Sequence, residues 1–313
     1  MDVSVIIVTY NSAKFIPACF ESFARFMQGI NYEIIVVDNK SSDSTLAIIR
    51  ERWPEVRIIE NNFNAGFAAA NNQGACIARG DYLFLLNADT EILDNGIEKA
   101  LRFARANNIA ILGPKTFGPG RILLKTWKEF NSLYFHMADL LSGALLLNRY
   151  FNSGRSAAES APRLVKFLTG SAMLISKNAY QRLGLFDEQF FFSGEERDLC
   201  MRFTTNGEKL SFFPDWSILH YVGHGESVSP FHYINWVKSS LKLARKHKGV
   251  LGYGLMVITL GIYSTSSALQ ATYKQMKAGA DMQHRANNAT ACRRLLYWFL
   301  GLMSEEKAMN APL

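Results

Sequence analysis

The first 115 residues alternate between short apolar runs, most of them rich in β-branched residues, and stretches whose apolar residues recur at helical spacing. The runs at residues 3–8, 33–38, 56–59 and 82–86 are typical of strands buried on both faces. The segments between them carry apolar residues three or four positions apart, as in amphipathic helices. This order of strand and helix predicts an α/β fold with a mainly parallel central sheet and helices on both faces.

Polar residues follow several of these predicted strands. Ligands of such sheets bind beyond the carboxyl ends of the strands, so we expect these residues to converge on one crevice. They are Thr9, Tyr10, Asn11, Asp38, Asn87 and Asp89. Asn87 and Asp89 stand two apart, so in an extended chain both side chains can reach one cation or diphosphate. An ordinary turn or helix cap is the alternative interpretation of this pair.

A second group of polar residues stands at a predicted helix start, where Glu195, Glu196 and Asp198 lie within four residues. Ser193 with Glu196 fits a capping box, and Asp198 fits an ion pair with Arg202 four residues later. The aromatic residues just before the cluster favour another interpretation. They would place a carboxylate beside an apolar wall, where its basicity rises and it can act as a general base.

Two histidines, His220 and His224, follow the strand-like run at residues 210–214. Histidines in a glycine-rich segment downstream of an acidic cluster fit either a structural role or metal ligation. Residues 116–166 show no clear period, and we expect a loop-rich connection there.

The charge is concentrated near the C-terminus. The chain has 313 residues and a net charge of +7, and residues 228–300 hold ten Lys or Arg and one acid, a balance of +9. Residues 249–273 carry no charge, although their apolar centre is shorter than the roughly 20 residues of a spanning helix. A spanning helix, a core helix and an interfacial helix all remain open. The basic residues suit an anionic membrane surface.

The compartment is predicted from the cysteines and the first residues. Cys19, Cys76, Cys200 and Cys292 are widely spaced, as expected for reduced thiols. The first residues include no basic segment and no small-residue cleavage site, so we expect no signal peptide. These features and the basic tail predict a cytoplasmic protein, peripheral on the inner face of the plasma membrane.

The order of the motifs resembles glycosyltransferase family 2, in its bacterial rhamnosyltransferase-like branch, over about residues 3–227. The motifs of the first half are VIIVTYN at 5–11, VVDN at 36–39, NAGFAAANN at 64–72 and LLNADT at 85–90. Those of the second half are LTGSAMLI at 168–175, GLFDE at 184–188, EERDLC at 195–200 and the segment 214–220. The resemblance implies a Rossmann-like GT-A fold with a C-terminal helical, membrane-proximal extension.

The implied reaction is an inverting, metal-dependent transfer of a sugar from a nucleoside-diphosphate donor, dTDP or UDP, to a saccharide or lipid-linked acceptor. L-Rhamnose from dTDP-rhamnose is the leading donor, and cell-surface polysaccharide synthesis is the implied process. The implied domains are a GT-A domain at 1–227 and a basic amphipathic helical tail at 228–313. Within the GT-A domain, residues 1–115 would bind the nucleotide sugar and residues 116–227 would form the acceptor and catalytic half.

The resemblance also implies a role for individual residues. The donor would be held by Thr9, Tyr10, Asn11, Asp38, Asn64, Gly66, Asn87 and Asp89. Mg²⁺ or Mn²⁺ would be held by Asp89, Asn87 and His220. Glu196 matches the catalytic base, and Asp187, Glu195 and Asp198 match the acceptor side. Two positions depart from the family, since Asn87 replaces an acid and Glu196 replaces an aspartate.

Three other functions are alternatives to this one. A non-catalytic nucleotide-sugar-binding or scaffold relative would keep the sheet and lose donor turnover. A nicotinamide-dependent oxidoreductase is disfavoured because no Gly-x-Gly-x-x-Gly follows the first strand. A nucleic-acid partner is not predicted, because no nucleic-acid motif appears and the basic residues alternate with apolar runs.

Overall fold

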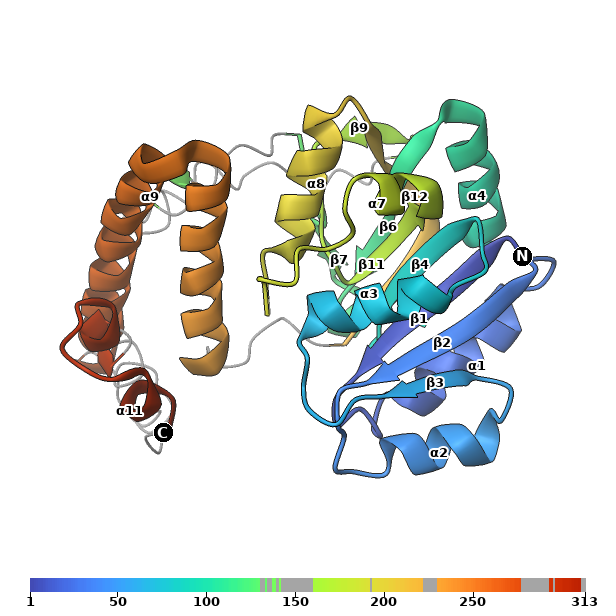
Figure 1. Cartoon of the computed structure of the whole chain (residues 1–313), viewed down its shortest axis with the longest axis horizontal. Coiled ribbons are helices and arrows are strands. Elements are labelled where there is room, and N and C mark those ends of the chain that lie inside the picture. Colours follow the sequence, from blue (N-terminus) through green and yellow to red (C-terminus); the bar gives the residue numbers. More distant parts are fainter. Residues whose placement is uncertain are drawn as a thin grey trace. The chain divides into compact units, whose positions relative to one another are not determined.

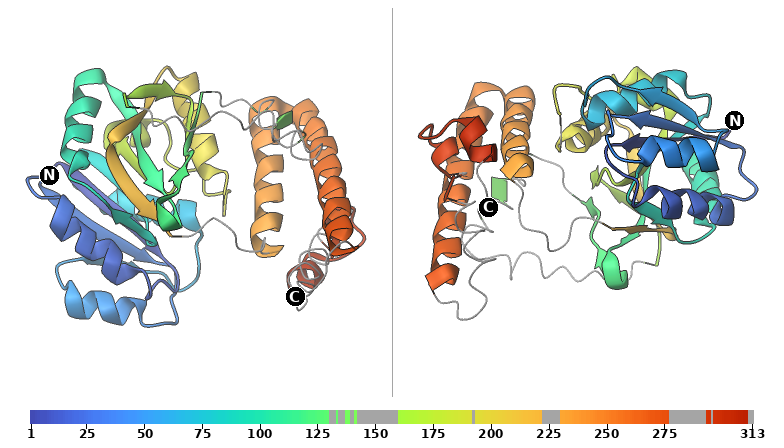
Figure 2. Two further views of the ribbon diagram at one scale, coloured as in Figure 1. Left: turned by 180° about the vertical axis from the view of Figure 1, so that it is seen from behind. Right: turned by 90° about the horizontal axis from the view of Figure 1, so that it is seen from below.

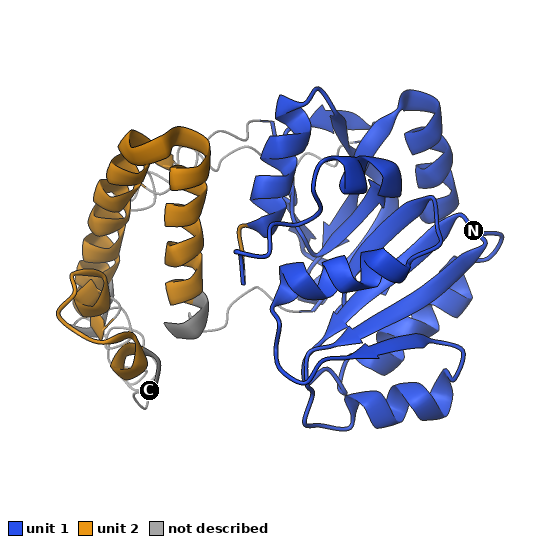
Figure 3. Ribbon diagram, in the orientation of Figure 1, with its two compact units in different colours: residues 1–131, 156–191, 195–224 blue, residues 132–155, 192–194, 225–313 orange. Residues whose placement is uncertain are grey.

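The computed structural model describes residues 1–129, 133, 137–138, 141, 160–191, 193–221, 230–276, 293–294 and 296–310. The chain divides into two compact units, coloured separately in Figure 3. Residues 1–131, 156–191 and 195–224 form the first unit, and residues 132–155, 192–194 and 225–313 form the second.

A mixed sheet organises the first unit, in the order β3-β2-β1-β4-β11-β6-β12-β5. Neighbours from β3 to β4 are parallel, as are β6 and β12, whereas β11 and β5 run antiparallel to their neighbours. The predicted parallel arrangement is therefore confirmed for the N-terminal half. The strands are β1 (Val3–Thr9), β2 (Tyr32–Asp38), β3 (Arg57–Glu60), β4 (Tyr82–Asn87), β5 (Thr90–Ile92), β6 (Ile109–Phe117), β11 (Ala172–Ser176) and β12 (Lys209–His220).

Short strands extend this arrangement. β7 (Leu123–Leu124) pairs with β6, and β9 (Arg163–Val165) pairs with β12. A separate two-stranded sheet joins β8 (Trp127–Lys128) to β10 (Phe167–Leu168). A short 3₁₀ turn at Pro119–Arg121 follows β6.

Helices cover both faces of the sheet, as the alternating pattern predicts (Figures 1 and 2). On one face, apolar side chains of α1 (Ile16–Phe26), α2 (Thr45–Arg52) and α4 (Gly96–Asn107) form one buried cluster with the sheet. On the other face, α3 (Phe67–Ile77), α7 (Lys177–Arg182) and α8 (Glu195–Thr205) form a second.

Strand β12 runs farther than the predicted run at residues 210–214. Its pairing with β6 shifts register between Phe213 and Ser217, a stretch that includes Pro214, which has no N–H to donate. Beyond the irregularity the strand continues to His220 and pairs there with β5. The extension carries His220 to the end of β4, where the site lies.

The second unit contains the helix α9 (Pro230–Met276), which is broken at Gly249, where φ is +64°. Its two arms, residues 230–248 and 250–276, lie side by side (Figures 1 and 2). The hydroxyls of Tyr233 and Ser264 are 2.5 Å apart, so the arms run antiparallel. α11 (Glu305–Asn310) packs on the first arm, with Glu305 accepting a hydrogen bond from Lys238.

Candidate active site

The ends of β1 and β2 are joined by a network around Asp38. Thr9 Oγ1 donates to Asp38 Oδ1 at 2.6 Å, and both the backbone N–H and the hydroxyl of Ser41 donate to the same carboxylate. Asp38 is 1% exposed and Thr9 is fully buried. These two residues, which were predicted to bind the donor, therefore hold together the loops that follow β1 and β2 and form the floor of the proposed donor site.

The rim of the crevice is formed by Tyr10 and Asn11. Asn11 adopts a positive φ of +51°, and its side-chain oxygen accepts a hydrogen bond from Ser42 N at 2.8 Å. This bond ties the loop after β1 to the loop after β2. Tyr10 is 55% exposed, so its ring is accessible to a planar base.

The loop at Asn64–Gly66 is held against β2 by the buried amide of Asn39. Asn39 donates to the carbonyl of Gly66 and accepts from Asn61. Asn64 Oδ1 accepts from Gly66 N at 3.0 Å in a local turn. Gly66 has a φ of +85°, and a methyl group added there would lie 2.7 Å from the carbonyl oxygen of Phe191. Only glycine fits this position.

The predicted metal-binding residues come together at the end of β4. β5 turns back from β4 and pairs with β12, with His220 opposite Thr90. His220 Nε2 lies 3.3 Å from Asp89 Oδ2. Asn87 Oδ1 is buried and has no hydrogen-bond partner among the described residues, so an electropositive group would satisfy it.

These donors are an amide oxygen, a carboxylate and an imidazole, which suit a divalent cation that takes its other ligands from phosphate and water. No group of three or more His, Cys, Asp or Glu gathers in the described part of the chain. Asn87, Asp89 and His220 would therefore supply only part of a cation's ligands, a partial site. His224 lies outside the described residues.

The predicted base, Glu196, is connected to this end of β4 through Gly170 and Ser171. A methyl group placed on Gly170 would lie 3.5 Å from Cβ of Glu196, so the two residues are neighbours. The next residue, Ser171, accepts a hydrogen bond from Asn87 N at 3.0 Å. The pairing of β11 with β4 therefore brings the helix that carries Glu196 to the end of the strand that carries Asn87.

The helix start itself differs from a capping box. α8 begins at Glu195, and the two residues before it, Ser193 and Gly194, have φ of +66° and +99°. An N-cap serine has extended backbone geometry and directly precedes the helix. Ser193 does neither, so the capping explanation for Glu196 is wrong.

Glu195 and Asp198, which were predicted to belong to the acceptor side, lie in the interior. Glu195 is 5% exposed, and burial, followed by the charge of Glu196, raises the pKa of its carboxyl well above the usual range. Asp198 is fully buried and accepts a hydrogen bond from Arg202 Nε at 2.7 Å, which confirms the predicted ion pair. Arg202 also donates to the carbonyls of Leu183 and Leu185.

The remaining acceptor-side residue, Asp187, is half-buried and accepts a hydrogen bond from Gln189 N at 3.0 Å. The loop that carries it is held by Asn72, a residue that sequence reasoning did not select. Asn72 accepts from Tyr180 Oη and Phe186 N and donates to the carbonyl of Phe186. The conspicuous Asn71-Asn72 pair was the signal that could have found it.

Tyr221 is a second residue that the sequence did not single out. Its N–H donates to the carbonyl of Asp89 at 2.9 Å, and its hydroxyl donates to the Glu91 carboxylate. That hydrogen bond raises the pKa of Tyr221 to about 12. The ring lies 5.8 Å from Phe15. These contacts fix the end of β12 beside Asp89.

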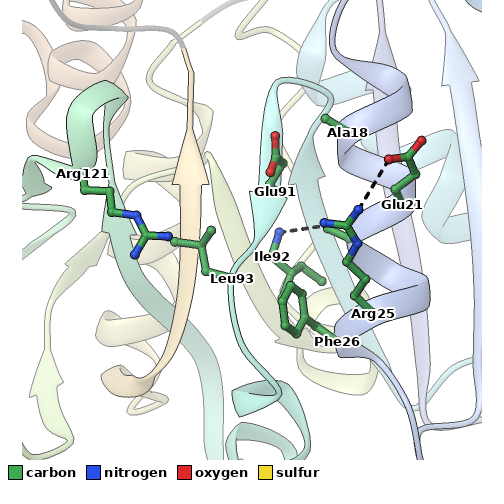
Figure 4. Close-up of a pocket in the computed structure, with 9 residues that line it drawn as sticks. Ala18, Glu21, Arg25, Phe26, Glu91, Ile92, Leu93 and Arg121 are labelled. Carbon is green, nitrogen blue, oxygen red and sulfur yellow. Dashed lines mark hydrogen bonds and ion pairs between the residues drawn. The ribbon is translucent and has the colours of Figure 1, made fainter.

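A pocket of about 290 Å³ lies between α1 and β5 (Figure 4). Ala18, Glu21, Ser22, Arg25, Phe26, Glu91, Ile92, Leu93 and Arg121 line it. None of the residues predicted to bind donor, metal or acceptor is among them. The convergent strand ends, rather than this pocket, form the candidate site.

Comparisons with known proteins identify the family of this chain. The sequence model of the family described as Glycosyl transferase family 2 matches residues 4–184, more than half of the chain. The N-acetylglucosaminyl-diphospho-decaprenol L-rhamnosyltransferase of Mycobacterium tuberculosis is 23% identical over 78% of this chain and 85% of its own length. Glycosyltransferase GlyG of Streptococcus pneumoniae is 22% identical over 95% of this chain and 96% of its own.

Solved structures match the fold. The crystal structure of S. aureus TarS 1–349 in complex with UDP has a TM-score of 0.55 and 17% identity, and the match covers 98% of this chain and 85% of that one. The same fragment in complex with UDP-GlcNAc has a TM-score of 0.54. At this identity the likeness shows the fold alone.

Proposed function

This chain belongs to glycosyltransferase family 2, and from that premise we propose that it catalyses inverting, metal-dependent transfer of a hexose from a nucleoside-diphosphate sugar. The leading donor is dTDP-L-rhamnose, and the acceptor is a saccharide or a lipid-linked sugar of cell-surface polysaccharide synthesis. The mycobacterial relative is named as an L-rhamnosyltransferase of a decaprenol-linked sugar, which supports this choice. TarS was crystallised with UDP and UDP-GlcNAc, so a UDP-sugar is the competing donor.

One observation carries the proposal. The hydrogen bond from Asn87 N to Ser171 O and the contact between Glu196 and Gly170 support the proposal, because they connect the helix of the proposed base to the strand end where a diphosphate would be held. A transferase of this kind needs a base on the acceptor side and a diphosphate site on the donor side. A single displacement then inverts the anomeric centre without a covalent intermediate.

Each residue then has a stated task. Glu196 takes the proton from the acceptor hydroxyl while that oxygen forms its bond to the anomeric carbon. The bond from this carbon to the diphosphate oxygen breaks, and the electron pair leaves with the nucleoside diphosphate. Tyr10 and the loop at Asn64–Gly66 border the nucleotide, over the floor made by Asp38.

Mg²⁺ or Mn²⁺ fits the donors of Asp89, Asn87 and His220. When bound, the cation would neutralise negative charge on the diphosphate. Asp89 supplies the one formal negative charge of this set, because Asn87 stands where the family motif has its first acid. The affinity for metal should therefore depend on the bound diphosphate.

The proposed location is the cytoplasm, with peripheral contact on the inner face of the plasma membrane. A lipid-linked acceptor would be presented there, and the second unit is basic. Within the described residues, the helix at Tyr233–Gln270 is long enough for a membrane span and contains an 18-residue window with a mean hydropathy of 1.3.

A donor screen tests the function. Purified full-length protein is incubated with dTDP-rhamnose or UDP-sugars and Mn²⁺, with short saccharides and a lipid-diphosphate sugar as acceptors. Released nucleotide and product are measured by mass spectrometry, and the product anomer by NMR. We expect turnover with one donor class and an inverted linkage. A retained linkage would contradict the mechanism, and donor binding without turnover across the acceptors would favour the non-catalytic relative.

A further inference from the structure

The second arm of α9 carries a row of exposed apolar side chains. Leu251 is 77% exposed, Ile258 is 62% exposed and Leu269 is 66% exposed. The full row consists of Leu251, Leu255, Ile258, Ile262, Leu269 and Tyr273, and we call it the apolar stripe. Its members are separated by three, four or seven residues, so at about 100° per residue they share one side of the helix.

The opposite side of this arm is already packed. Met256 and Leu260 are fully buried, and Ser264 bonds Tyr233 of the first arm. Gly252 lies against the first arm, since a methyl group there would be 3.2 Å from the carbonyl of Ala244. The arm thus has one face that packs within the hairpin and one apolar face that is exposed to solvent. Soluble proteins rarely expose a continuous row of large apolar side chains.

The basic residues beside the apolar stripe favour an anionic partner. Lys242, Arg245, Lys246 and Lys248 are exposed in the last turns of the first arm, next to Gly249, where the second arm and the apolar stripe begin. A second copy of the chain would bring the same positive charge. An anionic phospholipid surface supplies negative headgroups for the lysines and hydrocarbon for the stripe.

Helix packing indicates how deep the contact goes. The first arm lies along the second, as the Trp236–Tyr263 ring contact at 5.7 Å shows. A second arm that crossed the bilayer in this hairpin would take Lys242 and Arg245 into hydrocarbon. Charged side chains at that depth are costly, whereas a helix lying in the interface keeps them in water.

We propose that the apolar stripe is an interfacial docking face that inserts into the outer part of an anionic lipid leaflet, with the adjacent basic residues on the headgroups. The inference rests on the proposed peripheral location and specifies its contact surface. It does not depend on which sugar is transferred.

The test is flotation of full-length protein with vesicles of phosphatidylcholine, with or without phosphatidylglycerol. Wild type should float with the anionic vesicles, and high salt should reduce the bound fraction. Leu251→Glu and Ile258→Glu should each lower vesicle affinity roughly tenfold or more, because each removes an apolar contact with the lipid and adds a negative charge. Leu164→Glu is the matched control, since Leu164 is also 62% exposed but lies in β9 of the first unit.

Three outcomes would overturn the inference. The first is unchanged vesicle binding in both stripe variants. The second is protein that stays on the vesicles after washes with high salt and with alkaline carbonate, which would indicate a spanning helix. The third is a protein that self-associates, does not bind vesicles and becomes monomeric with Ile258→Glu. This result would indicate that a second copy of the chain covers the apolar stripe. Thermal melting and nucleotide binding, measured on every variant, separate these results from misfolding and from failure of the donor site.

Discussion

His220 Nε2 lies 3.3 Å from the carboxylate of Asp89, although the two residues are more than 100 positions apart in the sequence. Pairing of β12 with β5 produces this contact, since His220 stands opposite Thr90 and the next N–H, of Tyr221, binds the Asp89 carbonyl. The proposed cation ligands therefore meet only because β12 reaches far enough to pair with β5.

The contact leads to a prediction about metal-dependent nucleotide binding. Asp89→Asn should abolish the gain in UDP or dTDP affinity that Mn²⁺ provides, because it removes the formal negative charge of the proposed ligand set. His220→Ala should reduce that gain by at least about tenfold, since even outer-shell partners contribute that much to metal affinity. Calorimetry with and without Mn²⁺ measures both effects.

Asp81→Asn is the matched control for Asp89→Asn. Asp81 precedes β4 at the opposite end of the strand, and its side chain is 73% exposed. Its replacement should leave nucleotide affinity unchanged. Equal Mn²⁺ dependence in Asp89→Asn and wild type would refute the metal assignment.

A second prediction concerns the base. Glu196→Gln keeps the size of the side chain but cannot take a proton at neutral pH. Since Ser193 does not cap α8 through a capping box, this change should cost little stability while kcat falls by roughly 10²–10⁴-fold. Donor affinity should be unchanged. Steady-state kinetics and a thermal melt decide the matter, with Glu98→Gln on the exposed face of α4 as the control.

Near-normal turnover in folded Glu196→Gln would remove Glu196 as the base. Glu195 and Asp198 would not replace it easily, because they are 5% and 0% exposed. The proton acceptor would then have to be sought elsewhere on the acceptor side.

The sheet and the convergence of strand ends were predictable from local patterns. All residues of the run at 3–8 except Ser4 are β-branched, and the parallel order follows from alternation with helices. The buried position of the Asp38 carboxylate was not predictable, because it depends on hydrogen bonds from Thr9 and Ser41 that form only when β1 and β2 pair. A sequence shows that a carboxylate stands at a strand end but not how many donors surround it.

The capping-box interpretation failed for a related reason. Ser193 and Glu196 have the right spacing, but the motif also requires extended backbone at the serine. The φ of +66° at Ser193 belongs to the loop that enters α8, and residue spacing carries no information about it. The antiparallel pairings of β11 and β5 were missed likewise, because residue pattern does not fix strand direction.

A third prediction concerns the stability of the acceptor-side loop. Asn72→Ala should lower the free energy of unfolding by about 2–4 kcal/mol, because Tyr180 Oη, Phe186 N and the Phe186 carbonyl would lose partners in the interior. Urea unfolding measures the loss. Asn107→Ala is the control, because Asn107 Nδ2 makes an exposed bond to Phe103 O near the end of α4, and its change should cost less than about 1 kcal/mol. Equal losses would show that the Asn72 network contributes nothing beyond a surface bond.

The last prediction is a pH dependence caused by Glu195. Burial raises the pKa of this carboxyl above its unfolded value of 4.5, and one of its oxygens has no hydrogen-bond partner among the described residues. Between 4.5 and the folded pKa, the folded protein binds more protons than the unfolded chain. The contribution of Glu195 to the free energy of unfolding therefore falls as pH rises, by at most about 1.4 kcal/mol per pH unit.

Glu195→Gln removes this titration and keeps the shape of the protonated acid. Relative to wild type, the variant should gain stability steadily as the pH is raised above 4.5, and it should be at least as stable at neutral pH. Urea unfolding at a series of pH values gives the difference. Glu196→Gln should remove only part of the effect, because the neighbouring charge is a smaller cause than burial. A constant difference between Glu195→Gln and wild type across this range would show that Glu195 ionises as readily in the folded protein as in the unfolded chain.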